Sequence, residues 1–241
     1  MAITQSLALS KQADASRFQQ KHSQNLSSLC ELKAGVHSRE SAFRAELESY
    51  IHDAFARGYG ATINHFLPLL MSLQGSEGEL VAALGVREGG IEKLFLETYL
   101  DEPAEQRLAN VTGLNVQRDS IVEIGNLAST RPGSARWLFL ALAAYLEGRG
   151  TKWAIYTVAP FLKNTFLKLG FNLHVLAKAN KSRLGENAKD WGSYYDASPE
   201  VMAVDVSQAF HAVLHFVEAT GDDSLLHLCA DAFQMGAHSR P

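Results

Sequence analysis

Residues 38–57 have the spacing of an amphipathic helix. The apolar set Phe43, Leu47, Tyr50, Ile51, Ala54 and Phe55 falls on one face, and charged side chains lie elsewhere. Gly58 or Gly60 ends the predicted helix, because glycine commonly follows a last helical turn. Residues 1–37 lack such a pattern and are rich in Ser, Gln and Lys, so they are predicted to form a flexible N-terminal tail.

Two apolar runs after this helix predict a β-hairpin. The runs HFLPLLMSLQ (65–74) and GELVAALGVRE (78–88) have the length of strands, and a Gly-Ser-Glu-Gly turn joins them. The next segment, LFLETYLD (94–101), is apolar with acidic residues between. Its pattern does not distinguish a helix from a strand.

The middle of the chain predicts a strand–helix–strand unit. SIVEIGNLA (120–128) and TKWAIYTVA (151–159) are predicted buried strands. Residues 134–146 between them are apolar on nearly every side, which predicts a helix packed deep against a sheet and stopped by Gly148 and Gly150. Such a unit is almost always parallel, so together with the hairpin it predicts a mixed α/β fold.

Three further elements are predicted after residue 159. Pro160 suits the first turn of a helix that Gly170 closes, and HVLAKA (174–179) is a further strand. Residues 199–219 are predicted to be an amphipathic helix with an apolar face made of Val206, Phe210, Val213, Leu214 and Val217.

The composition is that expected of a soluble globular protein. Of the 241 residues, 46% are apolar and 20% charged, and a net charge of −4 gives no indication of nucleic-acid binding. Cys30 and Cys229 are expected to be two reduced thiols. Neither a signal-peptide core nor a run near the roughly 18 apolar residues of a membrane span is present in the sequence. A cytoplasmic protein without a transmembrane segment is therefore expected.

The stretch VEIGNLASTRPGSAR (122–136) is a candidate anion-binding turn. A strand that turns directly into a helix leaves backbone N–H groups unpaired at the positive end of the helix dipole. Arg131 and Arg136 add positive charge there. Any strand–helix connection has a similar turn, however, with Ser134 then serving only as the N-cap. The turn matches neither GxxxxGK[ST] nor GxGxxG, so its spacing alone favours the structural interpretation.

The order of elements changes that judgement. The strand–turn–helix–strand–helix block ending in FLKLGF (166–171) resembles the Gcn5-related N-acetyltransferase superfamily. The blocks LFLETYLD, IVEIGNLA, GSARWLFLALAAYL and WGSYYD (191–196) more specifically resemble the thermostable haemolysin family, over roughly residues 40–205. The chain is also distantly similar to acyl-homoserine lactone synthases. This resemblance implies an acyltransferase-like domain over 38–198, with a mixed sheet flanked by helices, and a C-terminal helical extension over 199–241.

In that superfamily, the turn after the fourth strand binds the pyrophosphate of coenzyme A, and the pantetheine arm lies where the fourth and fifth strands splay apart. The resemblance thus implies an acyl-CoA or acyl-phosphopantetheine co-substrate, with no tightly bound cofactor, held by Asn126, Leu127, Ala128, Arg131, Gly133, Ser134, Ala135, Arg136 and Asn164. Two positions depart from the family pattern. Pro132 removes one N–H donor from the turn, and Phe166 replaces a tyrosine that often acts as general acid. The donor is therefore either acyl-CoA or an acyl carrier protein.

Acyl transfer to an amine needs a base, N–H donors for the oxyanion and an acid. Glu123 is the first candidate base because burial in an apolar strand would raise its pKa; pairing with an arginine is the alternative. Glu97 is the second carboxylate, which would bind the acceptor amine or merely cap or pair. Tyr156 is the candidate acid, with Tyr194 or Tyr195 as substitutes, although WGSYYD is more typical of a packed aromatic corner.

The resemblance thus implies an N-acyltransferase with a small-molecule amine or amino acid as acceptor. An acyl carrier protein and a homodimer are the partners considered, and nucleic acid is not expected. His211 and His215 stand four apart, but no third ligand accompanies them, so no metal site is expected. Two alternatives stay open: a membrane-active haemolysin without acyl transfer, and a non-catalytic acyl-binding domain.

Overall fold

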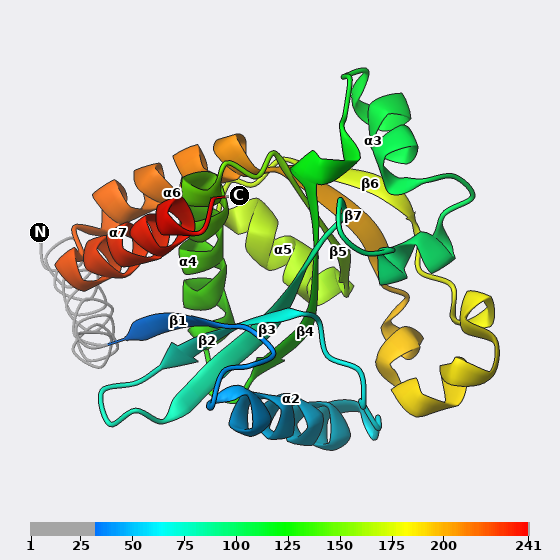
Figure 1. The fold of residues 1–241 in the computed structure, drawn as a ribbon, viewed down its shortest axis with the longest axis horizontal. Helices are drawn as coiled ribbons and strands as arrows, with labels where there is room; N and C mark the ends of the chain where they lie inside the picture. The colour runs from blue at the N-terminus through cyan, green and yellow to red at the C-terminus, as the bar shows by residue number, and fades with distance from the viewer. Residues whose placement is uncertain (1–31, 241) are drawn as a thin grey trace, which may run out of the picture.

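A computed structural model describes residues 32–240 of the chain. One seven-stranded sheet, in the order β1-β2-β3-β4-β5-β7-β6, runs through it (Figure 1). Only the β4–β5 pair is parallel in this sheet; the other neighbouring pairs are antiparallel. The strands are β1 (Lys33–His37), β2 (Leu69–Gln74), β3 (Leu80–Glu88), β4 (Ile121–Ser129), β5 (Trp153–Val158), β6 (Leu173–Lys178) and β7 (Glu200–Asp205). The mixed α/β fold predicted from the sequence is confirmed.

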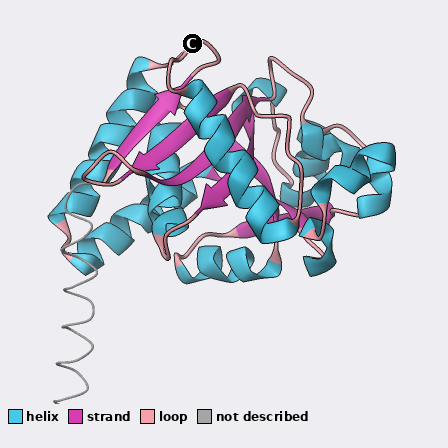
Figure 2. Cartoon of the chain, turned by 90° about the horizontal axis from the view of Figure 1, so that it is seen from below, coloured by secondary structure: helices cyan, strands magenta, loops and turns pink. Residues whose placement is uncertain are grey.

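Helices cover both faces of the sheet (Figure 2). One face packs against α4 (Ser134–Arg149), α5 (Pro160–Lys168), α6 (Val206–Thr220) and α7 (Asp223–His238). The other face packs against α2 (Arg44–Tyr59) and the short elements η1 (Phe95–Tyr99), α3 (Ala104–Thr112), η3 (Lys181–Trp191) and η4 (Tyr194–Ala197). The short η2 (Arg118–Ser120) leads directly into β4. The segment 94–101, whose type the sequence left open, is thus mainly the 3-10 helix η1.

The α4 helix is buried on nearly every side, as its sequence predicts. The sheet covers one side of it, and α6 and α7 cover others. Gly148 does not stop α4, contrary to the prediction. It lies inside the helix, where a Cβ would clash with the carbonyl oxygen of Phe233 in α7. Gly236 of α7 approaches the Tyr145 carbonyl equally closely, so the two helices touch through their backbones. Gly150, in a left-handed conformation with φ 84°, caps α4.

The predicted N-terminal tail extends too far. Residues Lys33–His37, assigned to it from the sequence, form strand β1, which pairs antiparallel with β2 at the edge of the sheet. Five residues with little apolar alternation give almost no strand signal, and long-range pairing with β2 overrides it. Residues 1–31, with Cys30 among them, lie outside the described part of the chain.

The predicted C-terminal helix begins too early. Residues Glu200–Asp205 form β7, which lies between β5 and β6 and so belongs to the central sheet rather than to a helical extension. The α6 helix begins at Val206, and Asp205 caps it by accepting a hydrogen bond from the Gln208 N–H at 2.9 Å. The apolar run VMAV is short and continuous, a pattern that fits a buried strand or a buried helix equally well.

Candidate active site

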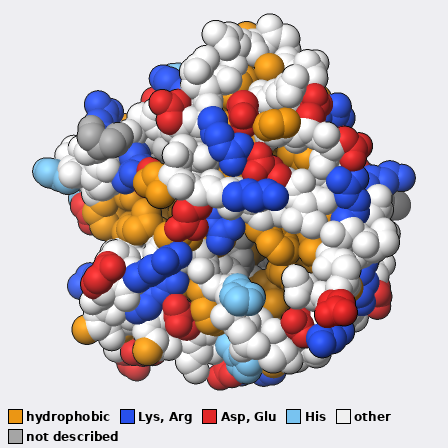
Figure 3. All heavy atoms as spheres, turned by 45° about the vertical axis from the view of Figure 1, so that its right-hand side comes forward, with side chains coloured by type: hydrophobic (Ala, Val, Ile, Leu, Met, Phe, Trp, Pro, Cys, Tyr) orange, Lys and Arg blue, Asp and Glu red, His pale blue; other side chains and the backbone are white. Residues whose placement is uncertain are grey.

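A cavity of about 470 Å³ lies on the α2 face of the sheet. Residues 62–67 form one side, and β3, β4, η1, η3 and Arg39 from the loop between β1 and α2 contribute the rest. Hydrophobic, basic and acidic side chains meet at a hollow near the centre of this side of the molecule (Figure 3). The cavity lining has the same mixed character, and the residues that matter for its chemistry are Arg39, Phe66, Arg87, Phe95, Glu123 and Trp191.

Glu123 projects from β4 into this cavity and is only 4% exposed. Its two carboxylate oxygens accept hydrogen bonds from the backbone N–H groups of Phe95, at 2.8 Å, and Leu96, at 3.0 Å. Arg87 on β3 lies opposite in the strand register, with its Nη1 3.4 Å from Oε2 of Glu123. Burial raises the pKa of Glu123, and the two N–H groups and Arg87 only partly offset that rise. The carboxylate is therefore fixed in place with a pKa moved toward the range of a useful base.

Glu97 does not line the cavity. Its carboxylate makes two hydrogen bonds with the Arg118 guanidinium, at 2.6 and 3.0 Å, and also accepts from the Ala104 N–H at 2.9 Å. The hydrogen bond from Arg118 is the main reason that the pKa of Glu97 is lowered. This carboxylate thus fastens η1 to α3 and η2, which is the capping and pairing alternative weighed from the sequence rather than a place for an acceptor amine.

Tyr156 lies on the opposite face of the sheet from Glu123. The β4–β5 register pairs it with Ile124, whose side chain faces α4 because alternate residues of a strand point to opposite faces. Its ring packs against Phe166, and its buried hydroxyl makes no hydrogen bond within residues 32–240. Burial strongly raises the pKa of Tyr156. A proton transfer between this hydroxyl and a group bound near Glu123 is not supported by this arrangement.

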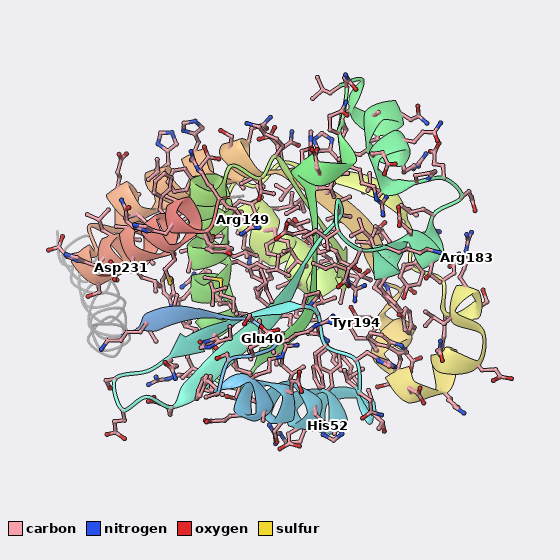
Figure 4. All side chains as sticks on the ribbon, in the orientation of Figure 1. Glu40, His52, Arg149, Arg183, Tyr194 and Asp231 are labelled. Carbon is pink, nitrogen blue, oxygen red and sulfur yellow. The ribbon has the colours of Figure 1, made fainter. Side chains whose placement is uncertain are left out.

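Tyr194 and Tyr195 belong to an aromatic cluster. Tyr194, the first residue of η4, lies near α2 (Figure 4), with its ring against Phe55, Tyr59 and Trp191. The Tyr195 hydroxyl makes a short hydrogen bond with the hydroxyl of Tyr99, and burial raises the pKa of Tyr194 and of Tyr195. The packed aromatic corner predicted from WGSYYD is what the structure shows.

Strands β4 and β5 separate next to the cavity. Their parallel pairing ends at Ile124 and Tyr156, and from there β5 stays paired with β7 as far as Val158. Within the described part of the chain, no strand pairs with the β5 side of β4 beyond Ile124. Gly125 and Asn126, the next two residues of β4, line the cavity. The predicted splay between the two strands is therefore present, and the cavity extends to Gly125, where the two strands begin to separate.

The turn between β4 and α4 presents backbone N–H groups without acceptors. Gly133, in a left-handed conformation, is the N-cap of α4, so the sequence-based assignment of that role to Ser134 is wrong. The Ser134 hydroxyl is buried, 2.8 Å from the Val81 carbonyl oxygen. Among residues 32–240, no acceptor faces the N–H groups of Arg131, Gly133 and Ala135. Three donors thus stand at the positive end of a long helix, even though Pro132 supplies none.

The two arginines of this turn have different surroundings. Arg131 is about half exposed, and its guanidinium lies 3.7 Å from the carboxylate of Glu79. Arg136 stacks on Trp137, with its guanidinium carbon 4.4 Å from the ring centroid, and desolvation lowers its pKa. Arg131 is therefore the more accessible of the two to an anion at the turn.

Asn126 is engaged in holding a loop. In a left-handed conformation with φ 53°, it accepts a hydrogen bond from the Leu67 N–H at 2.9 Å and donates one to the His65 carbonyl at 3.2 Å. It shapes the cavity wall by fixing residues 65–67, and both ends of its amide are occupied. Leu127 packs against the α4 side of the core and Ala128 against the α2 side.

The remaining predicted residues lie at the surface. Asn164 is exposed on α5. His211 and His215 are exposed on α6, and no group of metal-ligating side chains occurs in the described residues. None of the described helices is long and apolar enough to cross a membrane.

Several cavity residues were not singled out from the sequence. Arg39, Phe95 and Trp191 come from three distant segments, and no local pattern connects them. Arg87 is different, because an alignment of the predicted hairpin with β4 would have placed it opposite Glu123.

Three solved structures have a similar fold, and two of them are described as synthases of acyl-homoserine lactones or N-acyl amino acids. BjaI, a CoA-dependent acyl-homoserine lactone synthase solved with SAM and isopentyl-CoA, superposes with a TM-score of 0.54 and 16% identity, covering 84% of this chain and 98% of that one. TofI in its apo form superposes with a TM-score of 0.54 and 16% identity, covering 75% of this chain and 95% of that one. FeeM, an N-acyl amino acid synthase from uncultured soil microbes, superposes with a TM-score of 0.52 and 15% identity, covering 74% of this chain and 93% of that one. At these identities the likeness establishes a shared fold.

Comparison at the level of sequence gives the family. No curated protein matches the chain. A family model described as thermostable hemolysin matches residues 37–210, which is most of the chain. The protein therefore belongs to the thermostable haemolysin family and has the fold of the Gcn5-related acyltransferases that its sequence predicts.

Proposed function

We propose that this protein is an N-acyltransferase that moves an acyl group from a pantetheine thioester, on coenzyme A or an acyl carrier protein, to the amine of a small molecule such as an amino acid. One observation carries the proposal. The cavity into which Glu123 projects ends at Gly125 and Asn126, where β4 leaves β5. A base, an acceptor cavity and an opening for a thioester thus meet at one place.

The donor reaches this place from the turn before α4. The phosphate group binds the N–H groups of Arg131, Gly133 and Ala135, with Arg131 adding charge. From Ser129 back to Gly125, β4 spans roughly 13 Å at about 3.3 Å per residue. The pantetheine arm lies along this unpaired side of β4, and its thioester ends beside the cavity.

The reaction uses Glu123 as the base. The acceptor enters as an ammonium ion and gives one proton to the Glu123 carboxylate, which leaves a nucleophilic amine. The nitrogen attacks the thioester carbon, and the unpaired N–H groups of β4 beyond Ile124 stabilise the oxyanion. The carbon–sulfur bond then breaks, and the second proton of the nitrogen goes to the departing sulfur. The products are an amide and a free thiol, while Glu123 returns its proton to solvent.

Thiol release tests the proposal directly. Purified protein is incubated with a panel of acyl-CoAs and acyl carrier proteins and a panel of amines, and free thiol is measured while mass spectrometry identifies the new amide. We expect release that depends on both substrates and falls by roughly 10²- to 10⁴-fold in Glu123→Gln. Glu105→Gln, which alters an ion-paired carboxylate outside the cavity, is the control. Absence of thiol release with every donor would show the proposal to be wrong.

The same assay separates the alternatives. A non-catalytic acyl-binding domain would bind a donor without releasing thiol. Release from acyl-CoA but not from acyl carrier protein, or the reverse, identifies the donor. The cytoplasmic location and the homodimer stay predictions from the sequence.

A further inference from the structure

Two arginines line the cavity that would receive an ammonium ion. Arg39 and Arg87 both border it. Positive charges repel an ammonium group, so these residues do not serve the amine of an acceptor. Guanidinium groups bind carboxylates in a matched, often bidentate geometry, which indicates that the bound molecule also carries an anionic group.

Glu92 marks where a carboxylate is held between the two arginines. Its Oε1 lies 3.4 Å from Nη2 of Arg39, and its Oε2 lies 3.4 Å from Nε of Arg87. The contact with Arg87 lacks hydrogen-bond geometry, so the buried Nε makes no hydrogen bond in the described structure. Glu92 is also 36% exposed. It is a loosely held partner that a better-placed carboxylate can replace.

Arg87 also sets how far the anionic group lies from the base. Its Nη1 is 3.4 Å from Oε2 of Glu123, and its Nε is 3.4 Å from Oε2 of Glu92. A carboxylate bound by Arg87 is therefore a close neighbour of Glu123. Only a molecule whose amine and carboxylate are close together presents its amine to Glu123 from that position. An α-amino acid, with one carbon between the two groups, meets this condition.

Part of the remaining cavity wall is aromatic, beside polar residues that include Asn187 and Asp190. Phe66, Phe95 and Trp191 line it, and the rings of Phe95 and Trp191 stack with centroids 5.7 Å apart. Flat aromatic groups pack favourably on such a surface. The cavity volume, about 470 Å³, leaves room for a large side chain beside the amine and the carboxylate.

We propose that the acceptor is an α-amino acid with an aromatic side chain, whose carboxylate binds Arg39 and Arg87 in place of Glu92. The inference rests on the proposed function for the reaction, but it names a binding site that is measurable without any acyl donor.

Calorimetric titration of the full chain tests the binding site. The ligands are L-phenylalanine, phenethylamine, which lacks the carboxylate, and 3-phenylpropanoate, which lacks the amine. We expect phenylalanine to bind at least tenfold more tightly than either. Arg87→Met should weaken that binding roughly ten- to hundredfold, and Arg87→Lys, which keeps the charge but not the planar group, should weaken it less. Glu92→Gln should strengthen it several-fold by removing the competing carboxylate.

Arg107→Met is the matched control, since Arg107 is a partly exposed, ion-paired arginine that does not line the cavity. We expect the affinity for phenylalanine to be unchanged in this variant. Equal binding of phenethylamine and phenylalanine, or unchanged phenylalanine binding in both Arg87 variants, would overturn the inference.

Turnover separates this inference from the proposed function. In the thiol-release assay, Arg87→Met should raise KM for phenylalanine. A shift of the pH profile with KM unchanged would show that Arg87 only tunes Glu123, and would overturn its role in binding. Phenylalanine binding without thiol release from any donor would refute acyl transfer and leave the binding site standing. Thiol release that is equally fast with phenethylamine and with phenylalanine would refute the binding site and leave acyl transfer standing.

Discussion

At the residue scale, the three candidate catalytic residues differ because of their surroundings. Glu123 and Glu97 are both carboxylates with backbone N–H partners, yet burial dominates the first and Arg118 the second, so their pKa values move in opposite directions. Tyr156 sits one strand away from Glu123 and faces the other side of the sheet. Residue type alone does not reveal these differences, because desolvation and charge pairing depend on the fold.

The raised pKa of Glu123 predicts the acidic limb of the activity profile. Only the ionised carboxylate accepts a proton, so kcat/KM should fall as the pH drops through a pKa that lies above the ordinary value of 4.5. Measurement of thiol release from pH 4.5, the ordinary pKa of the carboxyl, up to about pH 9 checks this prediction. Arg87→Met should move the limb to higher pH, because the Arg87 charge holds the pKa of Glu123 down. An unchanged acidic limb in Glu123→Gln would assign it to another group.

The lowered pKa of Glu97 predicts a stability effect instead. A carboxyl whose pKa is lower in the folded than in the unfolded state stabilises the fold above its unfolded pKa, and this contribution disappears as the pH falls through the folded pKa. Glu97→Gln should therefore cost about 2 kcal/mol of unfolding free energy at pH 7, with a smaller difference from the parent chain below pH 4.5. Urea unfolding at several pH values measures it. A cost that is independent of pH would mean that the charge is unimportant.

At the scale of elements, the sequence predicted those parts whose signal is local. The helix α4 and the hairpin β2–β3 have strong patterns bounded by turn residues, and the structure confirms both. Strand β1 and strand β7 were missed because pairing partners, not their own residues, decide their conformation. The same holds for the cavity residues. Glu123 was predicted because it lies in an apolar strand, whereas Arg39 and Trp191 come close to it only in the folded chain.

The contact between α4 and α7 predicts unequal effects of adding a methyl group. Gly148→Ala should lower stability by roughly 1–3 kcal/mol, because the new Cβ meets the Phe233 carbonyl and must push the helices apart. Gly58→Ala is the matched control, since Gly58 is also helical and has open space around it, and it should be neutral or stabilising by up to about 1 kcal/mol. Thermal unfolding of both variants decides. Equal Tm values would mean that α7 shifts without cost.

At the scale of the whole molecule, one fold brings the proposed phosphate-binding turn, a strand opening and the proposed acceptor cavity into line along β4. The turn lies at the end of β4, the opening begins at Gly125, and Glu123 lies two residues before it. The proposed acyl transfer would also explain why the family is named for haemolysis. A protein that joins an acyl chain to an amino acid produces an amphiphile, with an apolar tail and a charged head, and amphiphiles enter lipid bilayers.

If the protein causes haemolysis, the lysis should therefore depend on its product. Purified chain added to red cells without an acyl donor is expected to release no haemoglobin, whereas the same chain supplied with donor and acceptor should cause lysis that grows with the amount of amide formed. The Glu123→Gln variant, given both substrates, should leave the cells intact, and the isolated amide should lyse them without protein. Release of haemoglobin by the purified chain alone would show instead that the protein itself acts on the membrane.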